Sequence, residues 1–214
     1  MNNTMGQSII INKPFGDATT GKLGMWLFII MDGITFATIL LGGIYLRIRS
    51  NLWPPAGEIL NIPLTSFNTF LLILTSFTMA MALNAIKKNN TKNLNLFLSL
   101  TVFGGIIFLT IQVYEYSHFI QGNDNLSLSL AKAGFLGESS FLWSTGVYGA
   151  TFYATTLFHG LHVFSGVIYL SIILYQTNRG VYSSKNYDRI EIAGLFWHFI
   201  DLVWILVFTI VYLI

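Results

Sequence analysis

The sequence predicts an all-α membrane protein, a polytopic bundle of five transmembrane helices. Of its 214 residues, 54% are hydrophobic and only 9% are charged, whereas ordinary soluble domains have about one-quarter charged residues. The mean hydropathy is +0.65. Most of the apolar residues fall into five long runs, which is the pattern typical of membrane-spanning helices.

Each run is long enough to cross a bilayer, because a helix rises about 1.5 Å per residue and ~20 residues cross the hydrocarbon core. The expected spans cover about residues 23–46, 66–86, 96–118, 146–175 and 192–214. The fourth run is longer than the core requires, so this span must tilt or protrude. We therefore predict one transmembrane domain, residues 23–214, after a polar segment, residues 1–22, that lacks the apolar core of a signal peptide.

The connections between the runs contain residues that interrupt helices. Pro54 and Pro55 follow the first run, Asn89 follows the second, and Asn178 follows the fourth. The third connection, residues 121–140, is the longest. Its LSLSLAKAGFLG stretch is too short to span the membrane, so we expect a short surface helix there.

Basic residues in the connections predict the orientation of the chain, because cytoplasmic loops carry an excess of Lys and Arg. One side carries Lys13, Lys22, Lys87, Lys88, Lys92, Arg179, Lys185 and Arg189, and the other carries Arg47, Arg49 and Lys132. We expect the N-terminus to lie in the cytoplasm and Ile214, after five crossings, to lie outside.

Composition also excludes several kinds of function. The sequence has no cysteine, which excludes disulfides, iron–sulfur clusters and thiol catalysis in this chain. Its net charge is +2, and its Lys and Arg residues are scattered and form no basic patch. Nucleic acid is therefore not an expected partner.

A few polar side chains interrupt the apolar runs, and these are informative because a charge at the bilayer centre costs about 2.5–3.5 kcal/mol. They are Asp32, Gln112, Glu115, His118, His159, His162, His198 and Asp201, with Glu191 at the inner rim. Residues three, four or seven apart share one helix face. This spacing puts Gln112, Glu115 and His118 on one stripe, His159 and His162 on a second, and Glu191, His198 and Asp201 on a third.

The second and third stripes should meet, because the fourth and fifth spans are antiparallel and share a short connection. A buried hydrogen bond between a His of one span and an Asp of the other is the simplest way to satisfy both. Gly160 and Gly166 are expected to permit close helix approach beside them.

Three interpretations of these residues remain open. The polar pairs could only fix helix packing and register. A heme or metal site could instead be built from His159, His162, His198 and Asp201, which are suitable ligand types. Proton handling is the third interpretation, and Asp32 is its best candidate. The first span offers Asp32 no charged partner, and a lone carboxyl in lipid favours its protonated form.

Six segments also carry a resemblance to a known family. They are GMWLFIIMDGITF at 24–36, WPPAG at 53–57, NTFLLILTSFTMA at 68–80, IQVYEY at 111–116, GVYGATFYATTLFHGLHVFSG at 146–166 and WHFIDLVWILVF at 197–208. Together they resemble subunit III of heme-copper terminal oxidases, the cytochrome c oxidase subunit III family. The chain is similar to the short five-helix bacterial form, without the two N-terminal helices of seven-helix members. Where that family usually has a buried Glu, this chain has Asp32.

The resemblance implies a non-redox accessory subunit of a proton-pumping oxidase that reduces O₂ to water, in the bacterial cytoplasmic (inner) membrane. It implies that this chain has no catalytic residue and no metal ligand, and that the hemes and copper lie in partner subunits. The implied partners are the catalytic subunit I, other oxidase subunits and membrane phospholipids, and a respiratory supercomplex is compatible with them. Asp32 would belong to the proton or lipid environment, and the remaining polar residues would hold the bundle.

Other functional classes remain open. One is subunit III of a quinol oxidase or of a nitric oxide reductase-type complex, since the electron donor and heme types are set by other subunits. Another is a free-standing heme or metal enzyme built on His159, His162 and His198. A transporter is disfavoured, because the sequence shows no inverted repeat.

Overall fold

The computed structural model describes residues 19–214 as a bundle of helices. The helices are α1 (Thr20–Arg49), α2 (Ala56–Ile59), α3 (Ile62–Lys87), α4 (Thr91–Gln121), α5 (Asp124–Lys132), α6 (Gly146–Asn178) and α7 (Asp188–Val207), which continues into a π-helical turn, η1 (Phe208–Leu213). Five of them, α1, α3, α4, α6 and α7 with η1, are long and apolar enough to cross a membrane. The predicted all-α fold with five spans is confirmed.

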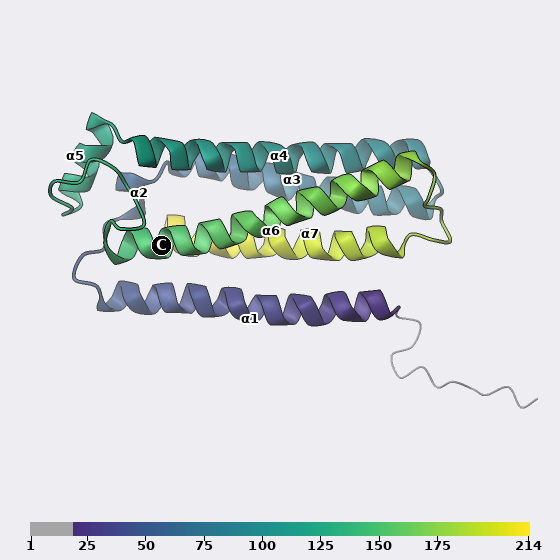
Figure 1. Ribbon diagram of the computed structural model, residues 1–214, viewed down its shortest axis with the longest axis horizontal. Helices are drawn as coiled ribbons and strands as arrows, with labels where there is room; N and C mark the ends of the chain where they lie inside the picture. The colour runs from purple at the N-terminus through teal and green to yellow at the C-terminus, as the bar shows by residue number, and fades with distance from the viewer. Residues whose placement is uncertain (1–18) are drawn as a thin grey trace, which may run out of the picture.

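Figure 1 shows these five long helices side by side, with successive helices running in opposite directions. The short helices α2 and α5 gather at one end of the bundle. Helix α6 crosses its neighbours obliquely, and this tilt accommodates the long fourth span. Helix α5 is the short helix expected in the third connection. The predicted polar segment 1–22 lies mostly outside the described residues, and α1 already begins at Thr20.

The helices extend a few residues beyond the predicted spans because their caps lie outside the apolar runs. The side chains of Thr19, Asn61, Asn90 and Asn123 each accept a hydrogen bond from a backbone N–H in the first turn of α1, α3, α4 and α5. Such caps satisfy backbone donors that have no partner inside the helix. Apolar content alone could not have located them.

Trp197 of α7 lies at the centre of the bundle and is 1% exposed. Its indole Nε1 donates a hydrogen bond to the Thr75 hydroxyl of α3 at 3.1 Å. A Cβ atom built at Gly105 of α4 would lie 2.8 Å from Trp197 Cη2, and one at Gly166 of α6 would lie 3.0 Å from Trp197 Cζ3. Four helices thus meet around one indole because two glycines leave room for it. The expectation for Gly160 was wrong, since a Cβ atom at this position would have no neighbouring atom within 4 Å.

Helix α1 is the outlying member of the bundle. It packs mainly on α7 and α6, and only 11% of its most apolar stretch is buried, against 33–44% for the other four spans. Its buried residues are Asp32, Phe36 and Leu40, which recur every four residues and form a single strip. This strip attaches α1 to the other helices.

The packing around Trp197 predicts that Gly105→Ala destabilises the bundle. The added methyl group must push away Trp197 and Val167, and overpacking of this kind costs about 1–3 kcal/mol. The free energy of unfolding in bicelles, measured by steric trapping, gives the cost. Gly160→Ala is the matched control and should be neutral or slightly stabilising. Equal effects of the two substitutions would contradict this account of the core.

Candidate functional site: buried polar contacts between the spans

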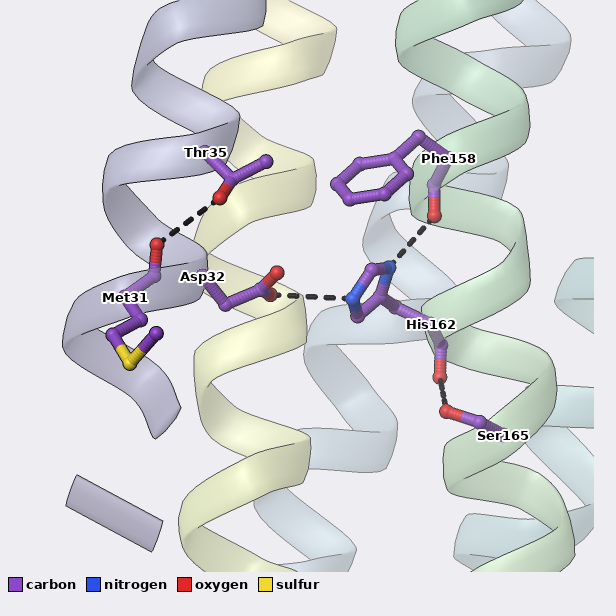
Figure 2. Close-up of polar contacts among 6 residues, drawn as sticks. All are labelled: Met31, Asp32, Thr35, Phe158, His162 and Ser165. Atoms are coloured by element: carbon purple, nitrogen blue, oxygen red, sulfur yellow. Dashed lines mark hydrogen bonds and ion pairs between the residues drawn. The ribbon is translucent and has the colours of Figure 1, made fainter. Parts of the chain in front are cut away.

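Asp32 of α1 faces His162 of α6 near the middle of the bundle. The distance from Asp32 Oδ2 to His162 Nε2 is 3.3 Å (Figure 2). Both side chains are largely withdrawn from the surface, with exposed fractions of 10% and 16%. The expectation that Asp32 has no charged partner holds for its own span, but the fourth span supplies one. The predicted lone carboxyl is therefore corrected to a paired one.

The second nitrogen of the imidazole determines how protons are shared in this pair. His162 Nδ1 lies 2.8 Å from the Phe158 carbonyl, which can only accept, so Nδ1 must carry a proton (Figure 2). In a neutral imidazole Nε2 is then an acceptor, and Asp32 must be protonated to bond it. In the charged form Nε2 donates to the carboxylate. The two forms differ by the position of one proton between two atoms, and both have zero net charge.

The surroundings of the pair leave few competing partners. The ring of Phe36, one turn after Asp32, lies 5.2 Å from the His162 ring and 4.9 Å from the Phe158 ring. The nearby hydroxyls bond their own helices, Thr35 to the Met31 carbonyl at 3.1 Å and Ser165 to the His162 carbonyl at 2.8 Å (Figure 2). The neighbouring hydroxyls therefore do not compete for the contact between Asp32 and His162.

Glu115 of α4 is the centre of a second buried cluster. Gln112 Nε2 and the Tyr212 hydroxyl each donate to Glu115 Oε2 at 3.1 Å, and the Thr65 hydroxyl lies 3.3 Å from Oε1. The carboxyl thus joins α4 to α3 and to the π-helical turn η1. His118, on the same predicted stripe, is exposed and lies 3.3 Å from the amide of Asn123.

The predicted His-to-Asp bond between the fourth and fifth spans was wrong. His162 turns to α1 instead, and His198 Nδ1 lies 2.5 Å from the Ser76 hydroxyl of α3. His159 is 1% exposed and packs on the rings of Trp204 and Phe108, with neither ring nitrogen hydrogen-bonded among the described residues. The reason is that α6 crosses α7 obliquely, so equal depth in the membrane does not bring the two stripes together (Figure 1).

Asp201 of α7 is also buried, with 5% exposure, and neither of its oxygens has a hydrogen-bond partner in the described part of the chain. Within residues 19–214, no three His, Asp or Glu side chains converge as a ligand set for a metal ion. The residues considered for a metal site therefore do not form a cluster of three ligands as they are arranged.

At the end of the bundle where α1 begins, Glu191 forms an ion pair with α1. Lys22 Nζ lies 2.7 Å from Glu191 and 3.4 Å from Asp188, both in the first turn of α7. This contact and the Asp32–His162 pair hold α1 at two depths. The sequence did not reveal Lys22 as a partner of Glu191, because Lys22 was used there only as one of the basic residues that predict the orientation of the chain in the membrane.

Several partners on α3 were also missed. They are Thr65 beside Glu115, Thr69 as acceptor for the Trp204 indole at 2.9 Å, Thr75 as acceptor for Trp197, and Ser76 beside His198. A signal for them was present, since these hydroxyl residues recur at helical spacing from the residue just before the second apolar run into that run. Hydroxyls are inexpensive in lipid because they can bond their own helix, so they did not stand out beside the ionisable residues.

Comparison with known proteins shows to which family this chain is similar. The family model for cytochrome c oxidase subunit III matches residues 125–214. The cytochrome c oxidase subunit 3 of Alkalihalophilus pseudofirmus is 31% identical over 193 residues, which cover 89% of this chain and 85% of the relative. The chain belongs to the cytochrome c oxidase subunit III family. The resemblance inferred from the sequence motifs is confirmed.

Other relatives extend the match over nearly the whole subunit III chain. The cytochrome c oxidase subunit 3 of Thermostichus vulcanus is 30% identical over 211 residues, covering 98% of this chain and 95% of the relative. The probable quinol oxidase subunit 3 of Staphylococcus saprophyticus is 28% identical over 211 residues, covering 95% and 94%. Relatives of this subunit thus carry names from both kinds of oxidase.

The geometry of the pair predicts strong coupling between Asp32 and His162. In a double-mutant cycle, Asp32→Asn and His162→Gln should each destabilise the subunit, and the double substitution should cost less than their sum by about 1–3 kcal/mol. The free energies of unfolding in bicelles are measured for the unsubstituted protein, the two single variants and the double variant. A parallel cycle with Asp32→Asn and His198→Gln serves as control and should be additive. Additivity in both cycles would mean that the 3.3 Å contact contributes nothing.

Proposed function

We propose that this chain is the non-redox subunit III of a proton-pumping heme-copper terminal oxidase that reduces O₂ to water. Family membership over most of the chain is the single observation that carries the proposal. Consistent with a supporting role, the contacts found for its buried Asp, Glu and His side chains join one helix to another. The oxidation chemistry would reside in the catalytic subunit I, which would hold the hemes and copper.

The proposal includes the membrane placement of the subunit. The chain would be a multi-pass protein of the bacterial cytoplasmic membrane with a cytoplasmic N-terminus. Support comes from the distribution of basic residues in the bundle, because Lys22, Lys87 and Arg179 lie at the end opposite Arg47 and Lys132 (Figure 1). The subunit would pack against subunit I and other oxidase subunits and would bind phospholipid.

Asp32 is the residue that would carry a proton-related role. Its contact with His162 Nε2 can hold one proton at either atom without changing the charge of the pair, so a proton could move between the two side chains at low electrostatic cost. The pair also lies on the thin strip that attaches α1, so its state and the position of α1 would be linked. Through these two properties the subunit would support proton uptake and protect subunit I from inactivation during turnover.

A quinol oxidase is the second candidate complex, because a probable quinol oxidase subunit 3 matches 95% of this chain. The donor would be recognised by other subunits, so the residues of this chain do not distinguish cytochrome c from quinol. A nitric oxide reductase-type complex would differ in its gas substrate. A free-standing enzyme would differ from all of these by holding its own cofactor.

Isolation of the native complex by a tag on this chain tests the proposal. A heme-copper catalytic subunit should co-purify, with an optical heme spectrum and O₂ consumption that cytochrome c or a quinol supports. Separation of the subunits should leave heme, iron and copper with the partner. Recovery of this chain alone with its own heme or metal would overturn the proposal.

Asp32→Asn in that complex tests the role of the pair. Neutralising the acid removes one of the two proton positions. We therefore expect fewer protons to be released per electron and activity to be lost faster during turnover, each by about two- to tenfold. Proteoliposomes with a pH indicator and an O₂ electrode give both quantities. Asp124→Asn, at an exposed position at the start of α5, is the control and should change neither. Unchanged pumping and inactivation in Asp32→Asn would leave this residue with a packing role only.

A further inference from the structure

The two ends of the bundle differ in charge. Within residues 19–214, the end where α1 begins carries seven basic and two acidic residues, whereas the opposite end carries three of each (Figure 1). The two acids at the first end, Asp188 and Glu191, both pair with Lys22. The other six basic residues there are exposed, and none forms an ion pair with a carboxylate of the described residues. We call them the basic surface: Lys87, Lys88, Lys92, Arg179, Lys185 and Arg189.

The basic surface is built from two connections that touch one another. In the turn between α3 and α4, the Asn89 side chain accepts a hydrogen bond at 3.4 Å from the backbone N–H of Ser184, which lies between α6 and α7. Lys87 Nζ lies 5.9 Å from the centre of the Tyr187 ring, again across the two connections. Both connections close the same end of the bundle (Figure 1). The basic residues therefore belong to one continuous surface.

The connection between α6 and α7 is held in place by its own contacts. Tyr182 is 5% exposed and anchors the connection in the bundle. The backbones of Ser183 and Asn186 exchange two hydrogen bonds, at 2.9 and 3.3 Å. Arg179 donates to the Tyr175 hydroxyl at 2.6 Å and lies 5.0 Å from the centre of that ring. Charges that are already positioned lose less conformational entropy when a partner binds.

The excess of positive charge favours an anionic partner. Like charges held on one surface repel one another, and an anion bound among them relieves this repulsion. Orientation of the chain in the membrane requires only an excess of basic residues, and does not require that they share one ordered surface. A single phosphate would reach few of six cations spread over two connections, whereas an extended peptide with several carboxylates matches their spread. Each cation lies in a connection or in a terminal turn of a spanning helix, so the peptide would approach from the aqueous side.

We propose that the basic surface binds an acidic cytoplasmic segment of another subunit of the oxidase complex, with several Asp or Glu side chains on Lys88, Lys92 and Lys185. The inference rests on the proposed function, because that function supplies both the partner subunits and the cytoplasmic placement of this end. The opposite end, where basic and acidic residues are equal in number, has no such excess and provides the comparison.

The first test uses the native complex isolated by a tag on this chain. A zero-length coupling reagent joins a lysine amine to a carboxylate that it contacts directly, and mass spectrometry identifies the joined peptides. We expect Lys88, Lys92 or Lys185 to be joined to Asp or Glu residues of another polypeptide. The yield should fall at least about fivefold in about 0.5 M KCl, because salt screens exposed charges.

A pair of matched variants separates charge from structure, with Lys185 as the reporter. In the complex, Lys88→Gln combined with Lys92→Gln should weaken the contact and speed acetylation of the Lys185 amine at least about fivefold. Lys88→Arg combined with Lys92→Arg keeps both charges and should leave Lys185 protected. Arg47→Gln combined with Arg49→Gln removes two charges from the opposite end and should change the acetylation rate less than about twofold.

Anionic lipid is the competing occupant, and bilayer composition separates it from a peptide. The complex is placed in nanodiscs of phosphatidylcholine alone and in nanodiscs with about one-third phosphatidylglycerol. We expect Lys185 to be acetylated at the same slow rate in both. Protection that appears only with phosphatidylglycerol would assign the basic surface to the membrane and overturn the proposal.

Two further results would overturn it: equal acetylation of Lys185 in the Gln and Arg variants, or coupling of the lysines only to carboxylates of this chain. The heme spectrum and O₂ consumption are recorded for every variant. A complex with intact heme and O₂ consumption whose lysines are joined to no other polypeptide would refute this inference and leave the proposed function standing.

Discussion

Exclusion of water from the bilayer is the constraint on which the rest of this structure depends. A carboxyl or imidazole among the apolar spans cannot be solvated, so a polar contact with another part of the protein stabilises it. Glu115 gathers donors from its own helix and from η1 and lies beside a hydroxyl of α3, and Asp32 reaches across from α1 to His162. Each of these contacts fixes the position of one helix against another. The few acids of the spans therefore determine much of the packing.

The sequence was sufficient to predict the helices but not their partners. Long apolar runs locate the spans, because crossing a bilayer demands a minimum length whatever the tertiary structure. The choice of partner depends on crossing angles, which the periodicity of a single helix does not contain. His162 and Asp201 illustrate this: both were placed on the correct helices at sensible depth, yet His162 pairs with α1 and Asp201 has no hydrogen-bond partner in the described chain.

The same distinction applies to small residues. Gly166 and Gly160 lie close together on α6 and look equivalent in the sequence, but only Gly166 lies against Trp197. The feature that separates them is the large ring on another helix, 31 residues further along the chain than Gly166. The family resemblance succeeded where such reasoning failed, since it rests on many segments at once and does not require any single contact to be known.

The π-helical turn at the end of α7 has a consequence for how this part of the chain tolerates change. A π turn holds one more residue than an α turn, which rotates everything beyond it by about 100°. Here the rotation is what brings the Tyr212 hydroxyl to Glu115. Loss of one residue among positions 208–211 would tighten the turn and swing that phenol toward lipid, although Tyr212 and Glu115 themselves had been retained. The position of the Glu115 cluster is thus encoded in chain length as much as in residue identity.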